Sequence, residues 1–598
     1  MQVRLKQLTQ VRMALVLAAT LAAPFPSHAG TATLNDTLAA LDDSAAVKAA
    51  QAGTASAAGA PSLLPAPAYA GTRAVGAFAL SADTPILTRG KDDQLADAAR
   101  YLHDVILRST GFALSTAGAD TAQGYARFIL LDVDAARKAT LGDEGYTLVS
   151  DPKGIVIRAA SAQGVFHGVQ TLLQLLPPAV YGPSPASAVW SVPGVALADW
   201  PRFGYRGAML DVARRFFPVD DVKRYIDEIA LLKYNTLHLH LTDDQGWRIA
   251  IDALPALTDI GGSTQSGFPS KAGNNWYYTA QQYADIVSYA KSRFITIVPE
   301  VDGPSHVSAA QASIANLNCN NQALAPYSGF DGPGLSLLCL TDPTHLANVK
   351  AYLHTVLPAV AAMTPGGYVH IGGDETPTGI TPAQYNAYIS AAAGEVATAK
   401  KTVIGWHQIG PATLTAGTLL QYWGDASDQK TIGTSSESKN IQQVRAGIKQ
   451  GARFILSPAD RAYVDMKYNA STPYGLSWEG YVDIQKSYGW DPETQLSSPD
   501  GKTRLLSAKQ IAGVEGTLWS DRAYPNSTSL PTPSTVWPAP RVYADYMAFP
   551  RLASIAELGW SPLGTHDWNG FKGRLATQGQ RWDAYGVGYY KSPEIAWQ

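Results

Sequence analysis

The stretch "RGAMLDVARRFFPVDDVKRYIDEIALLKYNTLHLHLTDD" (residues 206–244) decides the fold, because two short apolar runs flank an amphipathic segment. The middle segment repeats apolar residues at the spacing of one helix face: Val222, Ile226, Ile229 and Leu232. The flanking runs are short enough to be buried strands of a parallel sheet. The stretch therefore predicts a strand–helix–strand unit.

The same alternation continues along the chain, and eight apolar runs of this kind occur. They cover residues 206–214, 236–244, 295–302, 368–375, 402–408, 418–424, 453–459 and 511–521. Eight strand–helix units predict an α/β fold of the (β/α)8 TIM barrel type, with loop insertions, over residues 198–598.

A smaller α+β domain is predicted before the barrel, over residues 71–197. It is built from strands at 76–80 and 126–134, helices at 93–110 and 162–176, and a hairpin at 146–160. Residues 30–70 are rich in Ala, Gly, Ser and Pro and show little periodicity, so they are expected to form a linker, with order beginning near Gly71.

The first 29 residues have the pattern of an export signal. Three basic residues precede the apolar run "MALVLAATLAA", and "SHA" before Gly30 is a small-residue cleavage pattern. No later stretch reaches the roughly 20 apolar residues of a membrane helix. The mature protein is therefore expected to be exported to the periplasm or the medium and not to bind a membrane.

Composition and cysteine content narrow the class further. The 598 residues are 46% hydrophobic and 16% charged with a net charge of -3, which indicates a large globular core and no surface for nucleic acid. Cys319 and Cys339 are the only cysteines, and in an exported protein they are expected to form a disulfide.

The carboxyl ends of the eight predicted strands carry polar and aromatic side chains, and barrel enzymes build their sites there. In chain order these are Arg214, Asp243, Asp302 with His306, Asp374 with Glu375, Trp406, Trp423, Tyr463 with Asp465, and Trp519 with Asp521. Carboxylates beside aromatic rings are typical of sugar recognition, because ring faces stack on indoles while acids bind hydroxyls. The pattern favours glycoside hydrolysis.

Asp374 and Glu375 are adjacent in "YVHIGGDE" (368–375), and this adjacency is unusual for a glycosidase. Most glycosidases hold two carboxylates on opposite sides of the scissile bond. Neighbouring side chains of a strand point to opposite faces. The pair therefore indicates a nucleophile other than an opposed second carboxylate.

Motifs across the chain resemble those of the glycoside hydrolase family 20 β-N-acetylhexosaminidases. In the barrel they are "YRGAMLDVARRFF", "LHLHLTDDQGWRIAI", "PEVDGPSH", "HIGGDE", "VIGWHQ", "QYWG", "ILSPADRAYVDMKY", "GLSWEGY" and "AFPRLASIAELGWSP", and in the smaller domain "EGYTLV" and "GVFHGVQTLLQLL". Several motifs in the right order make the resemblance specific. It implies a retaining, exo-acting enzyme that removes terminal β-linked GlcNAc or GalNAc.

The resemblance also implies a role for each site residue. The substrate's own 2-acetamido group would act as the nucleophile, with Glu375 as general acid and then base. Asp374 would accept the acetamide N–H, and Tyr463 would donate to its carbonyl oxygen. Asp243 and His306 would support the acid.

The remaining implied roles concern sugar binding, and no cofactor or metal is among them. The tryptophans that would wall the acetamide pocket are Trp406, Trp423 and Trp519. The residues that would contact the sugar rings are Arg214, Asp465 and Trp478. The family usually has Glu where this chain has Asp521, one methylene shorter, followed by the Pro-rich insert 522–541, whose Arg522 and Trp537 are placed to reach back over the site.

Two rival functions remain open from the sequence. A metal-dependent barrel hydrolase is suggested by His238, His240, His306 and His370. The spacing argues against it, because His240, three residues before Asp243, is expected to sit about 10 Å lower in the barrel at 3.3 Å per residue. A catalytically inactive sugar-binding protein is the second rival. Chitooligosaccharides are the favoured substrate, with peptidoglycan pieces and host glycans open, as is the oligomeric state.

Overall fold

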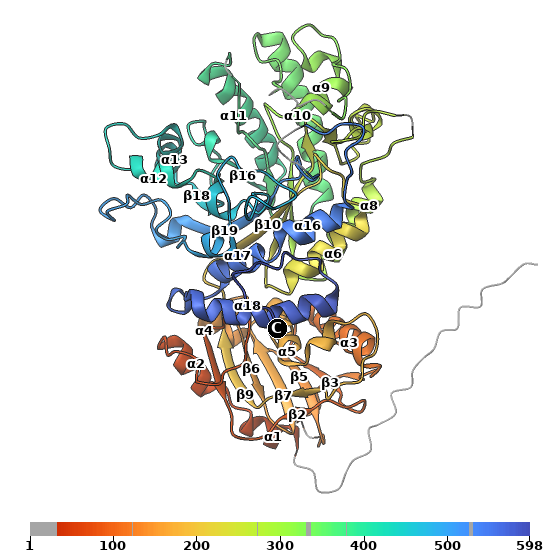
Figure 1. The fold of residues 1–598 in the computed structure, drawn as a ribbon, viewed down its shortest axis with the longest axis vertical. Helices are drawn as coiled ribbons and strands as arrows, with labels where there is room; N and C mark the ends of the chain where they lie inside the picture. Colours follow the sequence, from red (N-terminus) through yellow and green to blue (C-terminus); the bar gives the residue numbers. More distant parts are fainter. Residues whose placement is uncertain (1–32, 122, 272, 331–335, 378, 526–529) are drawn as a thin grey trace, which may run out of the picture.

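The computed structural model describes residues 33–598, apart from 122, 272, 331–335, 378 and 526–529. Two bodies lie one above the other in Figure 1, a barrel above and a smaller sheet domain below. Helix α18 (Trp568–Tyr585), near the carboxyl end of the chain, runs between them. Arg581 of α18 donates to the carbonyls of Ser62 and Gln174, so this helix contacts the lower domain directly.

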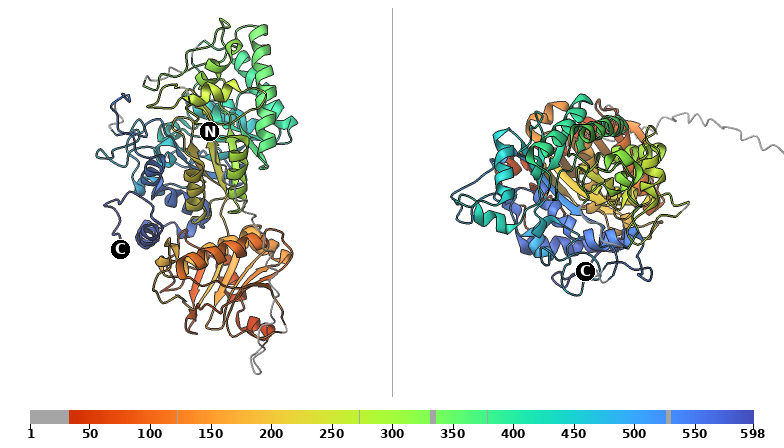
Figure 2. Two further views of the ribbon diagram at one scale, coloured as in Figure 1. Left: turned by 90° about the vertical axis from the view of Figure 1, so that its right-hand side faces the viewer. Right: turned by 90° about the horizontal axis from the view of Figure 1, so that it is seen from above.

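The barrel is closed and all its strands are parallel, as predicted. Its strands, in order around the barrel, are β10 (Tyr205–Asp211), β11 (Thr236–His240), β14 (Thr296–Glu300), β15 (Tyr368–His370), β16 (Thr402–Trp406), β17 (Leu419–Tyr422), β18 (Arg453–Leu456) and β19 (Ile511–Leu518). β19 pairs in parallel with β10 and closes the ring. The eight predicted runs are the eight strands, and the view from above in Figure 2 shows helices surrounding them.

Helices cover the outside of the barrel. The longer ones are α6 (Val219–Ala230), α8 (Ala280–Lys291), α10 (Pro343–Met363), α11 (Pro382–Thr398), α13 (Lys439–Lys449), α16 (Pro540–Ala548) and α17 (Arg551–Trp560). The short elements of the loops are β12 (Thr242–Asp243), β13 (Gly246–Trp247), α7 (Ala256–Asp259), α9 (Ser308–Ser313), α12 (Ala426–Thr431), α14 (Ala459–Ala462) and α15 (Ile484–Tyr488). Thr279 and Thr381 begin α8 and α11 with capping boxes, which satisfy exposed N–H groups there.

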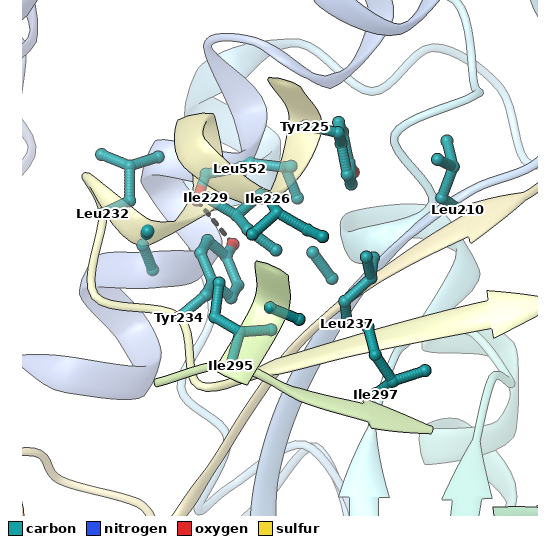
Figure 3. Close-up of a cluster of buried hydrophobic side chains, with 14 of the residues drawn as sticks. Leu210, Tyr225, Ile226, Ile229, Leu232, Tyr234, Leu237, Ile295, Ile297 and Leu552 are labelled. Atoms are coloured by element: carbon teal, nitrogen blue, oxygen red, sulfur yellow. Dashed lines mark hydrogen bonds between the residues drawn. The ribbon is translucent and has the colours of Figure 1, made fainter. Parts of the chain in front are cut away.

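The apolar face predicted for residues 219–234 packs onto the barrel wall (Figure 3). Ile226 and Ile229 of α6 are fully buried in one cluster with Leu237 of β11 and with Ile295 and Ile297 of the next strand segment. Burying one such side chain contributes about 1.5–3 kcal/mol. The Tyr234 hydroxyl donates to the Leu552 carbonyl at 2.7 Å, a bond drawn in Figure 3, and it joins the segment after α6 to α17.

The smaller domain is a seven-stranded sheet in the order β1-β9-β6-β7-β5-β3-β4. Its strands are β1 (Tyr69–Thr72), β3 (Ile86–Arg89), β4 (Thr116–Gly118), β5 (Phe128–Val133), β6 (Tyr146–Ser150), β7 (Gly154–Ala159) and β9 (Val195–Asp199), with β2 (Phe78–Ala79) paired to β8 (Ser191–Val192). Helices α3 (Leu95–Thr110) and α5 (Ala162–Leu175) lie on the sheet face toward the barrel, and α4 (Lys138–Leu141) is a single turn. The predicted helices and hairpin are present, and the sheet extends two residues past the predicted boundary at 197.

The prediction that residues 30–70 form a linker is wrong for the described part of that segment. Helices α1 (Leu34–Ala40) and α2 (Ser44–Gln51) fold onto the second face of the sheet, where Leu34 and Leu41 are buried against Phe128. Leu63 and Leu64 are also buried, and the Gln174 side chain bonds both the N–H and the carbonyl of Leu64. The helices were missed because the buried residues of α2 are the small alanines Ala46 and Ala50, and because α1 has only 7 residues, too few for a clear apolar pattern.

Two further expectations, on the disulfide and on membrane helices, can be compared with the described residues. Cys319 and Cys339 form a disulfide with their Cα atoms 5.0 Å apart, as predicted. Within the described residues, every helix is too short or too polar to cross a membrane. The predicted export signal, residues 1–29, lies outside the described part of the chain.

Candidate active site

A cavity of about 150 Å³ opens at the carboxyl ends of the barrel strands. The residues lining it are Arg214, His306, Asp374, Glu375, Trp423, Tyr463, Asp465, Leu476, Trp478, Trp519 and Asp521. The structure thus gathers the predicted site residues in one cavity wall, except for Asp243, Asp302 and Trp406, which are buried and do not line it. Leu476 was not predicted.

An irregular turn after β15 brings the two adjacent carboxylates into the same cavity. β15 ends at His370, and Gly372 and Gly373 follow with φ of 65° and 106°. A Cβ on Gly372 would lie 1.6 Å from Oδ1 of Asp302, so only glycine fits there. Glu375 also has a positive φ of 44°. Because the chain leaves the strand geometry, Asp374 and Glu375 no longer point to opposite faces.

Asp374 is buried and partly unsatisfied. Its Oδ1 atom has no hydrogen-bond partner among the described residues. Burial, with the nearby charge of Glu375, raises the pKa of Asp374 to about 7. A buried acceptor without a partner carries a free-energy cost that a ligand donor can remove. Asp374 is therefore ready to accept an N–H from a bound ligand.

Glu375 is the more exposed carboxylate, with 48% of its side chain accessible, and it contacts a histidine. Nε2 of His306 lies 3.2 Å from Oε2 of Glu375, and this hydrogen bond lowers the pKa of Glu375. On the other side of the ring, Nδ1 of His306 lies 3.5 Å from Oδ1 of Asp243. Burial disfavours the charged form of the imidazole, but attraction to the Asp243 carboxylate is the stronger effect. The pKa of His306 therefore lies well above its usual value.

Arg214 fixes the opposite side of Asp243. Its Nη2 atom lies 2.7 Å from Oδ2 of Asp243, and its guanidinium lies over the Trp519 ring at 4.9 Å. Asp465 and Asp521 line the same part of the cavity. Burial and the charge of Asp521 hold the pKa of Asp465 well above its usual value, and Oδ1 of Asp465 has no partner in the described chain. This wall offers both donors and acceptors to sugar hydroxyls.

Aromatic rings form the rest of the wall. The Tyr463 ring lies 6.1 Å from Trp519 and 5.9 Å from Trp478, and Trp423 lies 6.3 Å from Trp478. Burial and the charge of Asp374 hold the pKa of Tyr463 well above its usual value, so its hydroxyl remains a donor. Trp478 is 51% exposed and forms the outer rim. Such a pocket suits a ring with apolar faces and a polar edge.

Known proteins match this arrangement over most of the chain. The family model described as "Glycosyl hydrolase family 20, catalytic domain" matches residues 203–563, and the model for domain 2 of the same family matches residues 60–200. The chain belongs to glycosyl hydrolase family 20. Its activity is therefore that of a β-N-acetylhexosaminidase, and the proposed resemblance is confirmed.

Individual relatives agree with the family assignment. A β-N-acetylhexosaminidase of Cellulomonas fimi is 35% identical over 456 residues, covering 76% of this chain and 82% of the relative. The structure of the family 20 β-N-acetylhexosaminidase of Streptomyces coelicolor A3(2) has a TM-score of 0.77 at 41% identity, covering 90% of this chain and 99% of that one. A mutant Streptomyces plicatus β-hexosaminidase in complex with product (GlcNAc) has the same score and identity, covering 90% and 98%.

Trp406 lies deeper in this family 20 enzyme than the sequence suggests. It is fully buried, and its Nε1 atom donates to Oε1 of Glu300 at 3.0 Å. Its ring lies 5.8 Å from Trp519. Trp406 therefore supports the pocket wall through Trp519 and does not line the cavity itself.

The expected 10 Å separation of His240 from Asp243 is wrong. Nε2 of His240 lies 2.8 Å from Oδ2 of Asp243, because β11 ends at His240 and the chain turns back at β12. The other ring nitrogen of His240 contacts Glu300, which also bonds His238 and His370. The barrel histidines are thus hydrogen-bonded in the interior. Donor atoms of His238, Glu300 and His370 lie close enough to hold a metal ion, but their contacts with one another already account for their positions.

The described part of the insert after Asp521 (residues 522–525 and 530–541) does not line the cavity. The Trp537 ring lies 4.9 Å from the Arg215 guanidinium and 4.8 Å from the Tyr524 ring, and Gly267 leaves the space that this ring fills. Neither Arg522 nor Trp537 lines the cavity. The expectation that they reach back over the site is not met by these described residues of the insert.

Three supporting residues were missed by the sequence analysis. Ser305 donates to the Asp374 carbonyl at 2.6 Å and fixes the turn that carries the catalytic pair. Asp244, next to Asp243, lies 3.6 Å from His306, and Ser336 donates to Asp244. The repeated Asp in "LTDD" was a possible signal for Asp244, whereas nothing in the sequence singled out either serine.

Proposed function

We propose that this family 20 enzyme acts on the non-reducing ends of glycans and removes β-linked GlcNAc or GalNAc with retention of configuration. The observation that carries the proposal is the adjacent pair in one pocket, with Asp374 buried and Glu375 partly exposed. Two neighbouring carboxylates cannot act from opposite sides of one bond. The nucleophile is then the substrate's own 2-acetamido group.

The first step transfers one proton, forms one carbon–oxygen bond and breaks the glycosidic carbon–oxygen bond. The acetamide carbonyl oxygen attacks the anomeric carbon while Glu375 gives its proton to the departing oxygen, and an oxazolinium ion forms. Asp374 accepts the acetamide N–H and stabilises the positive charge that develops on that group. Tyr463 donates to the carbonyl oxygen and aims it at the anomeric carbon.

The second step reverses the proton transfer. Water enters from the side that the leaving group has vacated, Glu375 takes its proton, and the ring of the oxazolinium opens to the product sugar. The configuration at the anomeric carbon is retained because two inversions occur. Trp423 and Trp519 keep other water away from the acetamide while the ion exists.

The first step needs a protonated Glu375 and an ionised Asp374. Without substrate, the protein favours the opposite protonation of both groups. In the empty pocket the pKa of Glu375 is lowered by His306, while burial raises the pKa of Asp374 to about 7. A substrate N–H bonded to Asp374 favours its ionised form, and a leaving group over Glu375 removes water and favours its protonated form. Substrate binding thus completes the working protonation state.

The rim of the cavity supports a chitooligosaccharide substrate. Trp478 lines the cavity with an exposed ring, on which the next sugar of a chitooligosaccharide can stack. The GlcNAc complex of the Streptomyces plicatus relative supports GlcNAc as the sugar that is released. We also propose export of the enzyme to the periplasm or the medium, on the pattern of residues 1–29.

A thiazoline that mimics the cyclised intermediate tests the mechanism. It should bind at least 10²-fold more tightly than the product sugar, because it resembles the state the pocket stabilises. Aryl β-glucosides, which lack the acetamide, should not be cleaved. Thiazoline binding no tighter than that of the product would contradict the proposal.

A further inference from the structure

A strap closed by the disulfide lies on the loop that carries His306. We define the strap as residues 336–339. The Leu338 N–H donates to the Pro304 carbonyl at 2.9 Å, and the Cys339 N–H donates to the Leu317 carbonyl at 3.0 Å. The Gln311 side chain donates to the Leu337 carbonyl at 2.9 Å, and the disulfide joins Cys339 to Cys319. The strap is therefore bonded to the His306 loop through Leu338, and its Cys339 end is fixed to Leu317 and Cys319 after α9.

Ser336, the first residue of the strap, joins two parts of the site through one hydroxyl group. Its oxygen accepts the Val307 N–H at 2.7 Å and donates its proton to Oδ1 of Asp244. Val307 follows His306, whose backbone φ of 59° lies in the left-handed region that residues other than glycine rarely adopt. The hydroxyl thus helps to hold the backbone of His306 and a carboxylate beside its ring.

Asp244 is buried, and its two oxygen atoms have different partners. Oδ1 accepts from the Ser308 N–H at 2.9 Å and from the Ser308 hydroxyl at 2.7 Å, in addition to Ser336. Oδ2 lies 3.6 Å from Nδ1 of His306. Because Asp243 lies 3.5 Å from the same nitrogen, His306 faces two carboxylates on this side.

We propose that Asp244 and Ser336 are positioning residues that set the orientation and proton affinity of the His306–Glu375 pair. This inference rests on the proposed role of Glu375 as general acid and base. Ser336 orients Asp244, Asp244 orients His306, and His306 contacts Glu375 at 3.2 Å. The strap thereby connects the disulfide to Glu375, although no strap residue lines the cavity.

The charged groups around His306 fix the sign of the effect. The groups that face it are Asp243 and Asp244 after β11, Asp302 on its own loop, and Asp374 and Glu375 after β15, with Arg214 and His240 bound to the far side of Asp243. His306 and Glu375 titrate as a pair. Removing the negative charge of Asp244 lowers the proton affinity of the His306–Glu375 pair. The pair therefore loses its shared proton at a lower pH.

The first test is the pH profile of kcat/KM for Asp244→Asn, which keeps the size of the side chain. We expect the basic limb to move to lower pH by about 0.5–1 unit, the size of a shift from one nearby charge. A basic limb at the wild-type position, in a variant that still melts cooperatively, would overturn the role of Asp244.

The second test uses the strap serine and a series of aryl N-acetylglucosaminides with leaving groups of different pKa. Ser336→Ala should lower kcat/KM about 10-fold for poor leaving groups and much less for good ones, below the 10²–10⁴-fold expected from loss of the acid itself. Ser336→Thr retains the hydroxyl and should restore most of the activity. Ser313→Ala is the control, because among the described residues that hydroxyl bonds just the Ala309 carbonyl within α9.

Two outcomes separate this inference from the proposed function. Equal losses for good and poor leaving groups in Ser336→Ala, with tight thiazoline binding in the wild type, would overturn the strap inference alone. Weak thiazoline binding by the wild-type enzyme would instead contradict the acetamide mechanism on which the inference rests.

Discussion

Nε2 of His306 lies 3.2 Å from Oε2 of Glu375, and this contact gives the two adjacent carboxylates different surroundings. Glu375 has a basic partner and a half-exposed side chain, whereas Asp374 is buried with an unpartnered oxygen. The contact lowers the pKa of Glu375, and burial raises that of Asp374 to about 7. Environments that move two pKa values apart are the usual basis for giving two acids different roles.

Glu375→Gln should slow poor leaving groups far more than good ones. Loss of a positioned acid costs about 10²–10⁴-fold, and an activated leaving group needs little protonation. The measurement is kcat/KM over a series of aryl N-acetylglucosaminides. Equal slowing across the series would remove Glu375 from the role of general acid.

Asp374→Asn should reduce turnover severely and yet stabilise the fold above neutral pH. A carboxyl whose pKa rises to about 7 on folding stabilises the protein fully below its unfolded pKa, near 4, and that stability is lost as the pH rises toward 7. The increase in the free energy of unfolding caused by Asp374→Asn should therefore be about 1–3 kcal/mol larger at pH 8 than at pH 5. Thermal or denaturant unfolding at the two pH values measures it, and a pH-independent difference would contradict the raised pKa.

Asp521→Glu should change the selectivity between gluco and galacto epimers at C4. Asp521 lines the cavity and lies in the field of Arg214, and its arm is one methylene shorter than the family's usual Glu. A charge-assisted hydrogen bond contributes about 1.5–3 kcal/mol, so a restored contact should shift the ratio several-fold or more. The check is kcat/KM for both epimers in wild type and variant, and an unchanged ratio means that Asp521 does not contact the C4 hydroxyl.

Removing the disulfide should lower stability by about 3 kcal/mol, the loop-closure contribution expected for a loop of this size. The Cys319→Ser, Cys339→Ser double variant is compared with the wild type in urea unfolding, at equal protein concentration. A difference below about 1 kcal/mol would mean that the contacts of the strap hold the loop without the bond.

The sequence predicted the barrel well because each strand is a short apolar run followed by polar residues, and all eight runs became strands. It failed at α2, where the small alanines Ala46 and Ala50 make the buried surface, and at α1, whose 7 residues bury only Leu34 and Thr37 and are too few for a clear pattern. It also misplaced His240, because residue spacing gives a distance only while the strand continues. Asp244 and Ser336 lie 92 positions apart in the sequence, and local patterns do not encode a contact over that separation.

The central claim is that the substrate's acetamide oxygen is the nucleophile. The most direct test is whether kcat/KM depends on the electron density of that oxygen. We would measure kcat/KM for aryl glucosaminides bearing acetyl, fluoroacetyl, difluoroacetyl and trifluoroacetyl groups. The account predicts a steep fall with each fluorine, because each makes the carbonyl oxygen a weaker nucleophile. A flat series, together with a covalent sugar adduct on Asp465 or Asp521 detected by mass spectrometry, would contradict it.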